Sequence, residues 1–269
     1  MTPKYFDVHS HVSFSDYDKD REEVLDRMKA DGVASITVGV DFKSSESAVK
    51  LAELHENLYA SIGVHPADNR KETFDPKKYE TLVNNKNVVA IGECGLDYFR
   101  IDEKDVAEKD RQRDIFLKQI DFAAKNKKAM MLHCRPRRGT LDTYLETLET
   151  LEEKKREYGD KLFGNVHFFV GNTAIARRFY DINFTTSFTG VITFAHNYDD
   201  TIRAAPINML LSETDCPFAT PVPFRGKRNE PIYVEKVVRR IAEIRGEDFE
   251  TVRGALVENA YRVFSIDIN

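Results

Sequence analysis

The sequence has few cysteines, no long apolar run and no excess of positive charge, and each of these absences excludes a class of protein. Its three cysteines, Cys94, Cys134 and Cys216, are odd in number and far apart, which argues against a secreted disulfide framework. No apolar run approaches the roughly 20 residues of a membrane helix. The N-terminus lacks the basic and apolar pattern of a signal peptide. We therefore expect a cytoplasmic protein.

Charge and composition describe a globular chain. With 40 Lys and Arg against 45 Asp and Glu, no global positive field attracts nucleic acid or an anionic membrane, so any specificity for anions must come from a local site. A hydrophobic fraction of 41% is ample for a packed core. No linker or low-complexity segment divides the chain. We expect a single domain over residues 1–269, and we favour a monomer because nothing in the sequence argues for an oligomer.

Short apolar runs alternate with amphipathic helical stretches along the whole chain. Such runs, nearly continuous in apolar residues, are typical of parallel strands buried on both faces. At this length the pattern predicts a TIM-like (β/α)8 barrel, with an open doubly wound sheet as the less favoured alternative. The expected strands are Tyr5–Val8, Ile36–Val40, Leu58–Val64, Val88–Ile91, Ala129–Leu132, Val166–Val170, Ile182–Thr186 and Ile207–Leu211.

Histidines and carboxylates gather at the expected carboxyl ends of these strands. Because side chains alternate along a strand, Asp7, His9 and His11 are expected to project to the same side. In a closed barrel, the carboxyl ends of all strands meet on one face, so residues remote in sequence converge there. Four imidazoles and two carboxylates form a ligand set for two divalent cations. This predicted set is His9, His11, Glu93, His133, His167 and Asp215.

Several neighbouring residues have open interpretations. Each cysteine directly follows a proposed ligand, so one step along the strand turns it into packing, with a thiolate ligand as the alternative. His65 follows the third expected strand and is a ligand, a residue behind the ligands or a substrate contact, the last two being favoured. Arg135 lies two residues after His133, where its guanidinium offers a fork for phosphate or carboxylate, or is simply solvated.

A proline-rich stretch follows the last expected strand. Proline fixes the backbone angle φ and removes a hydrogen-bond donor, so this segment is predicted to be a shaped loop. Its position at the active-site face of a barrel favours a wall facing the substrate over an ordinary surface loop. The side chains expected there are Phe218, Phe224, Arg225, Lys227 and Arg228.

Taken together, these motifs resemble those of the TatD family of metal-dependent hydrolases. The resemblance runs almost from end to end and is specific in combination. It implies a TIM-like barrel and a metal-dependent deoxyribonuclease or related phosphoester hydrolase. The matching motifs are DVHSH at Asp7–His11, GVHP at Gly63–Pro66, GECGLD at Gly92–Asp97, HCR at His133–Arg135, ETDCPF at Glu213–Phe218, RNEP at Arg228–Pro231 and NAYRVF at Asn259–Phe264.

The resemblance also implies a division of roles. His9, His11 and Asp215 would hold the first cation, Glu93 would bridge, and His133 and His167 would complete the second site. From the charge and chemistry of such a site, and not from the resemblance, we infer that water ionised between the cations would attack phosphorus, with Asp215 accepting its proton. His65 and Arg135 would brace the phosphate, and Asp7 would orient a ligand from behind. The identity of the cations, Mg, Mn or Zn, is left open by this ligand set.

One position departs from the family pattern. After His167 the family usually has Phe followed by Ser or Thr and then Gly, whereas this chain has His167-Phe168-Phe169-Val170-Gly171. Valine thus replaces the small hydroxyl residue, while the histidine is kept. The change affects either the second cation site or a contact with the substrate.

Three hypotheses for function follow. The favoured one is a DNase that trims DNA from the 3′ end, with single strands fitting a cup better than duplex. The second is hydrolysis of a small ester, lactone or amide, because the same barrel and ligands serve both chemistries. The third is a barrel that binds nucleic acid or protein without turnover. A rim bearing Phe99, Phe218 and Phe224 would favour the first by stacking bases.

Overall fold

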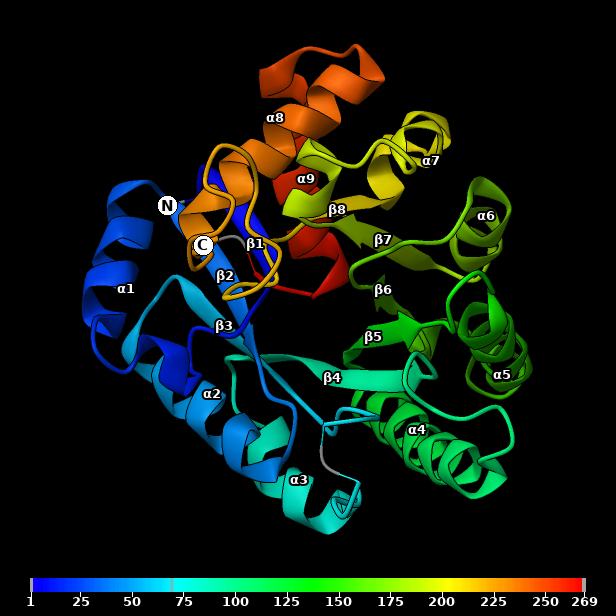
Figure 1. Ribbon diagram of the computed structural model, residues 1–269. Helices are drawn as coiled ribbons and strands as arrows, with labels where there is room; N and C mark the ends of the chain where they lie inside the picture. Colours follow the sequence, from blue (N-terminus) through cyan, green and yellow to red (C-terminus); the bar gives the residue numbers. More distant parts are fainter. Residues whose placement is uncertain (1, 69, 268–269) are drawn as a thin grey trace.

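The computed structural model describes residues 2–68 and 70–267, and a sheet of parallel strands lies at its centre (Figure 1). The strands follow one another around the sheet in chain order, and every neighbouring pair is parallel. The strands are β1 (Tyr5–Ser10), β2 (Val33–Val38), β3 (Leu58–Ile62), β4 (Val88–Asp97), β5 (Ala129–Arg135), β6 (Gly164–Val166), β7 (Phe184–Phe188) and β8 (Leu210–Ser212).

The sheet closes where the end of β1 meets the segment after β8. Ser10 and Cys216 form a parallel bridge there. The N–H of His11 donates to the carbonyl of Cys216 at 2.8 Å, and the N–H of Asp215 donates to the carbonyl of His9 at 2.9 Å. This closure confirms the predicted barrel and excludes the open doubly wound sheet.

Helices surround the barrel, as Figure 1 shows in a view along its axis. Most follow a strand and bury one apolar face against it, as Phe116, Ile120 and Ala123 do on the helix after β4. The helices are α1 (Arg21–Ala30), α2 (Phe42–Leu54), α3 (Pro76–Val83), α4 (Val106–Asn126), α5 (Asp142–Tyr158), α6 (Thr173–Asp181), α7 (Asp199–Ala204), α8 (Val234–Arg245) and α9 (Phe249–Val263).

Helix starts are fixed by side chains that satisfy unpaired backbone N–H groups. Asp41 accepts from the N–H of Ser44 at 2.7 Å at the start of α2, and Asp105 accepts from Glu108 at 3.1 Å at the start of α4. The last helix, α9, packs on β1 and β8, where Tyr261 meets Phe6 edge to face at 5.7 Å. Across the described ranges, none of the helices has the length and apolar character needed to span a bilayer.

The bounds of all eight strands differ from the ranges expected from the sequence, and those of β6, β7 and β8 show one reason. Ile182 ends α6 instead of starting a strand, so β7 begins at Phe184. The apolar start of the eighth run, Ile207–Met209, is a 3-10 helix, and β8 begins only at Leu210. The sixth run was expected over Val166–Val170, but β6 ends at Val166. Short apolar runs do not distinguish a strand from a helical turn, which explains these shifts.

Candidate metal centre

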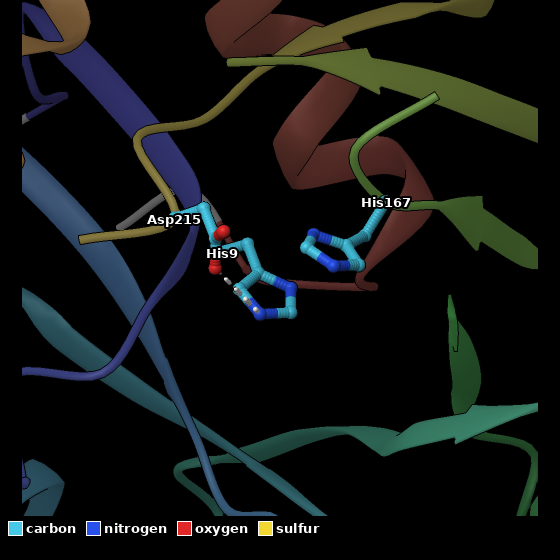
Figure 2. A group of neighbouring side chains, drawn as sticks. All are labelled: His9, His167 and Asp215. Carbon is cyan, nitrogen blue, oxygen red and sulfur yellow. Dashed lines mark ion pairs between the residues drawn. The ribbon is translucent and has the colours of Figure 1, made fainter. Parts of the chain in front are cut away.

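Three of the predicted ligands meet above the end of β1 (Figure 2). His9 stacks on His167 with ring centroids 3.7 Å apart, although the two belong to β1 and to the segment after β6. Asp215 follows β8, and its Oδ1 lies 3.8 Å from His9 Nε2 and 3.5 Å from His11 Nε2. The backbone pairing that closes the barrel therefore also brings Asp215 to His9 on β1 and to His11 directly after it.

Glu93 lies at the centre of the cluster with its two oxygens facing different histidines. Oε2 is 3.4 Å from His9 Nε2 and 3.8 Å from His11 Nε2. Oε1 is 2.7 Å from His133 Nδ1 and 3.1 Å from His167 Nε2. Sequence reasoning placed Glu93 after its strand, but it lies inside β4, where the pairing with β5 is irregular. An irregularity of this kind re-aims a side chain.

Two buried carboxylates stand behind the second pair of histidines. Asp97 Oδ2 is 3.1 Å from His133 Nε2, and Glu213 Oε1 is 3.2 Å from His167 Nδ1. Sequence reasoning gave neither carboxylate a role. For Asp97 the signal was present, because it lies four residues after Glu93 on the same strand, so alternation turns both toward one side, whereas Glu213 and Asp215 follow the end of β8.

The donor set fits divalent cations. In the described part of the chain, four groups of nitrogen and carboxylate oxygen atoms lie within 4.8 Å of one another, and all six predicted ligands belong to at least one. Imidazole nitrogens with carboxylates suit zinc, manganese or iron. The four groups are His9–His167–Asp215, His9–His11–Glu93, His65–Asp97–His133 and Glu93–His133–His167.

Burial and the neighbouring charges shift the pKa values of the histidines in opposite directions. Burial, with the nearby His167, lowers the pKa of His9 to about 3, so this ring is neutral. Burial opposes the charging of His133, but hydrogen bonds with Asp97 and Glu93 raise its pKa to about 9. For Glu93, burial opposes ionisation, yet the surrounding histidines hold its pKa well below the usual range. Without cations, His133 and Glu93 therefore form an ion pair.

This ion pair predicts that cation uptake releases protons. Near pH 7, His133 is protonated, and the nitrogen that faces Glu93 must lose its proton before it binds a cation. Proton release should therefore be observed at pH 7 and should decrease as the pH rises through about 9, while apparent affinity increases. Calorimetric Zn²⁺ titrations in buffers of different ionisation enthalpy measure the release. Equal heats in all buffers at pH 7 would contradict the expectation.

A cavity of about 700 Å³ opens directly above the cluster. His65 lines it, with Nε2 3.6 Å from Glu93 Oε1, while its Nδ1 accepts backbone N–H groups of Ala67 and Asp68 at 3.2 and 3.1 Å. Nδ1 also lies 3.0 Å from Asp68 Oδ1, and Nε2 lies 3.3 Å from His133 Nδ1. Arg135 also lines the cavity and stacks on exposed Phe99 at 4.1 Å.

Asp7 lies beneath the centre and contacts the backbone on both sides of it. It accepts from the N–H and the hydroxyl of Thr214 at 2.8 and 2.6 Å, and from the N–H of His9 at 3.3 Å. Burial raises the pKa of Asp7 well above its usual value, against these hydrogen bonds. Among the described residues, Asp7 thus hydrogen-bonds the segments that carry His9 and Asp215, and it does not hydrogen-bond the side chain of a candidate ligand.

The cysteines are packed in the interior. Cys94, Cys134 and Cys216 are free and buried, and burial raises the pKa of the Cys134 thiol to about 12. Cys134 approaches Thr147 on α5 at 3.6 Å. Over residues 2–68 and 70–267, the groups of potential metal ligands include none of the three.

Much of the proline-rich loop faces away from the cavity, which corrects the expectation of a continuous substrate-facing wall. Phe218 lines the cavity and is 54% exposed, so it stands at the rim as predicted. Arg228 instead pairs with Asp20 at 2.6 Å. Phe224 stacks on Tyr233 at 4.2 Å. These two side chains therefore contact residues outside the cavity and hold the loop against the barrel.

Arg225 and Lys227 of the same loop are not among the residues that line the cavity. Arg225 stacks on Phe194 at 4.0 Å and donates to the carbonyl of Thr220 at 3.2 Å. Lys227 is exposed, and its carbonyl accepts from the hydroxyl of Thr220 at 2.7 Å. Among the described residues, Phe218 is the one loop side chain of those expected to face a substrate that lines the cavity.

Comparison with known proteins identifies the family. The model of the TatD-related DNases matches residues 6–265. The chain belongs to this family. A relative from Bacillus subtilis, named as the uncharacterised metal-dependent hydrolase YabD, is 38% identical over 97% of this chain and 99% of its own length. A relative from Pectobacterium parmentieri, named as the 3′-5′ ssDNA/RNA exonuclease TatD, is 31% identical over 97% of this chain and 99% of its own.

Solved structures agree with the TatD assignment. The crystal structure of the TatD homologue YJJV from Escherichia coli superposes with a TM-score of 0.87 at 27% identity, covering 99% of this chain and 100% of that one. The fold and the family together establish a TatD-type metal-dependent hydrolase. The departure from the family pattern, Val170, lines the cavity, and its N–H donates to the hydroxyl of Tyr144 at 2.9 Å.

Proposed function

We propose that this protein hydrolyses phosphodiester bonds of DNA as a 3′-5′ exonuclease that prefers single strands. The observation that carries the proposal is the cavity above the metal centre, where two arginines, Arg100 and Arg135, form no salt bridge in the parts of the chain that the structure describes, although the charge of Arg135 helps to lower the pKa of Asp97. Most other arginines contact an acid, as Arg113 does with Glu146 at 2.6 Å. Unpaired guanidinium groups beside a metal centre suit phosphate oxygens.

The shape of the cavity supports a single strand. Phe99 and Phe218 are exposed at its rim, 44% and 54% respectively, and aromatic faces of this kind stack bases without regard to sequence. A volume of about 700 Å³ accommodates a nucleotide, and we expect a flexible single strand to enter such a cup more readily than a duplex. The exonuclease named among the relatives acts on single-stranded DNA or RNA, which agrees with this proposal.

Six residues would hold the two divalent cations. His9, His11 and Asp215 would hold one divalent cation and His133 and His167 the other, with Glu93 between them. Cations in these positions supply Lewis acidity and lower the pKa of water.

Asp215 would accept the proton of the attacking water, since its carboxylate lies at the cavity beside His11. His65 would donate its Nε2–H to a phosphate oxygen, and Arg135 would hold a second oxygen.

The three free, buried cysteines suit a reducing, cytoplasmic compartment.

The proposal is tested with metal-stripped protein reloaded with Mg²⁺, Mn²⁺ or Zn²⁺. Single-stranded DNA labelled at the 3′ or the 5′ end, duplex DNA and an aryl ester are offered in parallel. Stepwise loss from the 3′ end, faster on single strands and absent without cations, is the expected result. Hydrolysis of the aryl ester with DNA left intact would instead assign the centre to a small ester, lactone or amide.

A further inference from the structure

We propose that Asp97 and Glu213 are positioning residues that hold the proton of His133 and His167 on the ring nitrogen facing away from Glu93, so that the other nitrogen is free for a cation. The inference deepens the proposed function, because it names the residues that prepare the second cation site. Its test measures ion binding without substrate, so its outcome is independent of whether DNA is hydrolysed.

The two histidines present opposite ring nitrogens to the centre. His133 points Nδ1 at Glu93, 2.7 Å away, and Nε2 at Asp97, 3.1 Å away. His167 does the reverse, with Nε2 3.1 Å from Glu93 and Nδ1 3.2 Å from Glu213. A carboxylate behind a ligand histidine holds the proton on the distal nitrogen and leaves the other nitrogen free for the cation.

His9 on β1 and His11 directly after it have no carboxylate behind the ring among the described residues. His11 directs Nδ1 at the carbonyl of Val38, 2.9 Å away, and the buried Nδ1 of His9 has no hydrogen-bond partner in the described structure. Carboxylates behind imidazoles are therefore a property of the cluster that contains His133 and His167. Loss of either carboxylate should accordingly affect one cation site more than the other.

The partners of Asp97 determine what an asparagine would do in its place. Asp97 Oδ1 accepts from the N–H of Phe99 at 3.0 Å, which would keep the amide oxygen of asparagine on that side. The amide NH₂ would then face His133 Nε2 and donate to it. His133 would be forced to carry its proton on Nδ1, the nitrogen that faces Glu93, and a protonated nitrogen cannot bind a cation.

Glu213 responds differently to the matching change. Its Oε1 accepts from the N–H of Phe168 at 2.6 Å, and this donor would keep a glutamine oxygen beside His167 Nδ1. The amide NH₂ would take the place of Oε2, where Ser187 Oγ, now 2.6 Å away, can accept from it. The tautomer of His167 is therefore kept in Glu213→Gln, although one negative charge is lost.

Zn²⁺ titration of the metal-stripped full-length chain separates the two effects. In Asp97→Asn, the more weakly bound of the two Zn²⁺ ions should bind about 10- to 100-fold less tightly than in the wild type. In Glu213→Gln, the affinity for that ion should fall by less than about tenfold. The other ion should bind with near wild-type affinity in both. Asp142→Asn, which removes a carboxylate that pairs with Arg137 outside the centre, is the matched control.

A second variant and a spectroscopic measurement distinguish a change of tautomer from a simple folding defect. Asp97→Ala imposes no tautomer, and water from the cavity that Asp97 lines can reach His133, so it should bind Zn²⁺ more tightly than Asp97→Asn. Nitrogen-15 spectra of the labelled histidines should show neutral His133 protonated on Nδ1 in metal-free Asp97→Asn.

Three results would overturn the proposal. The first is equal losses in Asp97→Asn and Glu213→Gln, which would indicate charge alone. The second is a greater loss in Asp97→Ala than in Asp97→Asn, which would indicate packing alone. The third is unchanged Zn²⁺ affinity in all of these variants.

Discussion

Replacing Asp215 by asparagine is expected to lower metal-dependent turnover of DNA by about 10²- to 10⁴-fold while leaving the barrel folded. The amide cannot accept the proton of the attacking water, and it is a weaker cation ligand than the carboxylate beside His11. The backbone should tolerate the change, because Asp215 has a φ of 53° and asparagine enters this left-handed region more readily than most residues. Single-turnover rates on 3′-labelled DNA measure the effect.

Asp200→Asn is the matched control for this experiment, since the Asp200 carboxylate is 92% exposed on α7, where it pairs with Arg203. Its turnover should equal that of the wild type. Turnover that depends on metal and disappears in Asp215→Asn would also dispose of the hypothesis of a binding barrel without catalysis. Unchanged turnover in a folded Asp215→Asn protein would remove Asp215 from the mechanism.

Replacing Glu93 by glutamine is expected to have the largest effect on cation content. Its two oxygens face different histidines, with Oε2 nearest His9 and Oε1 nearest His133. Glutamine offers one carbonyl oxygen, and its amide nitrogen does not bind cations, so at least one of the two sites loses its carboxylate ligand. We expect at most one ion per chain after dialysis and a fall in turnover of at least about 10³-fold.

Elemental analysis of dialysed protein and the DNA assay together test this expectation. Glu152→Gln is the control, because Glu152 pairs with Arg178 between α5 and α6 at 2.8 Å, away from the centre. It should keep both ions and full turnover. Wild-type ion content in Glu93→Gln would show that the carboxylate does not bridge the two sites.

The candidate ligands could be found from the sequence because each follows from a local pattern. Apolar runs mark the strands, and a histidine or carboxylate at the end of a run marks the face where barrel strands converge. His9, His133 and Asp215 were found in this way, and the structure brings them into one cluster. The same pattern carried the resemblance to the TatD family, which the family comparison confirms.

The residues behind the ligands were harder to recognise. Asp97 and Glu213 lie in the same motifs as Glu93 and Asp215, and strand alternation would have turned Asp97 toward the site. Their roles depend on which ring nitrogen each carboxylate meets, and the sequence does not contain that distance. The loop after β8 was misjudged for the same reason, since the partners of Arg228 and Phe224, Asp20 and Tyr233, cannot be read from the loop itself.

The sequence by itself determined the barrel, the family and the identity of the candidate ligands, because strand period and residue type are local properties of the chain. Tertiary structure alone decided how these residues work together. It closed β1 onto the segment after β8, turned the two oxygens of Glu93 toward different histidines, and placed Arg135 over the ring of Phe99 in the cavity wall. These features depend on distances between segments far apart in the chain, which arise only when the barrel closes.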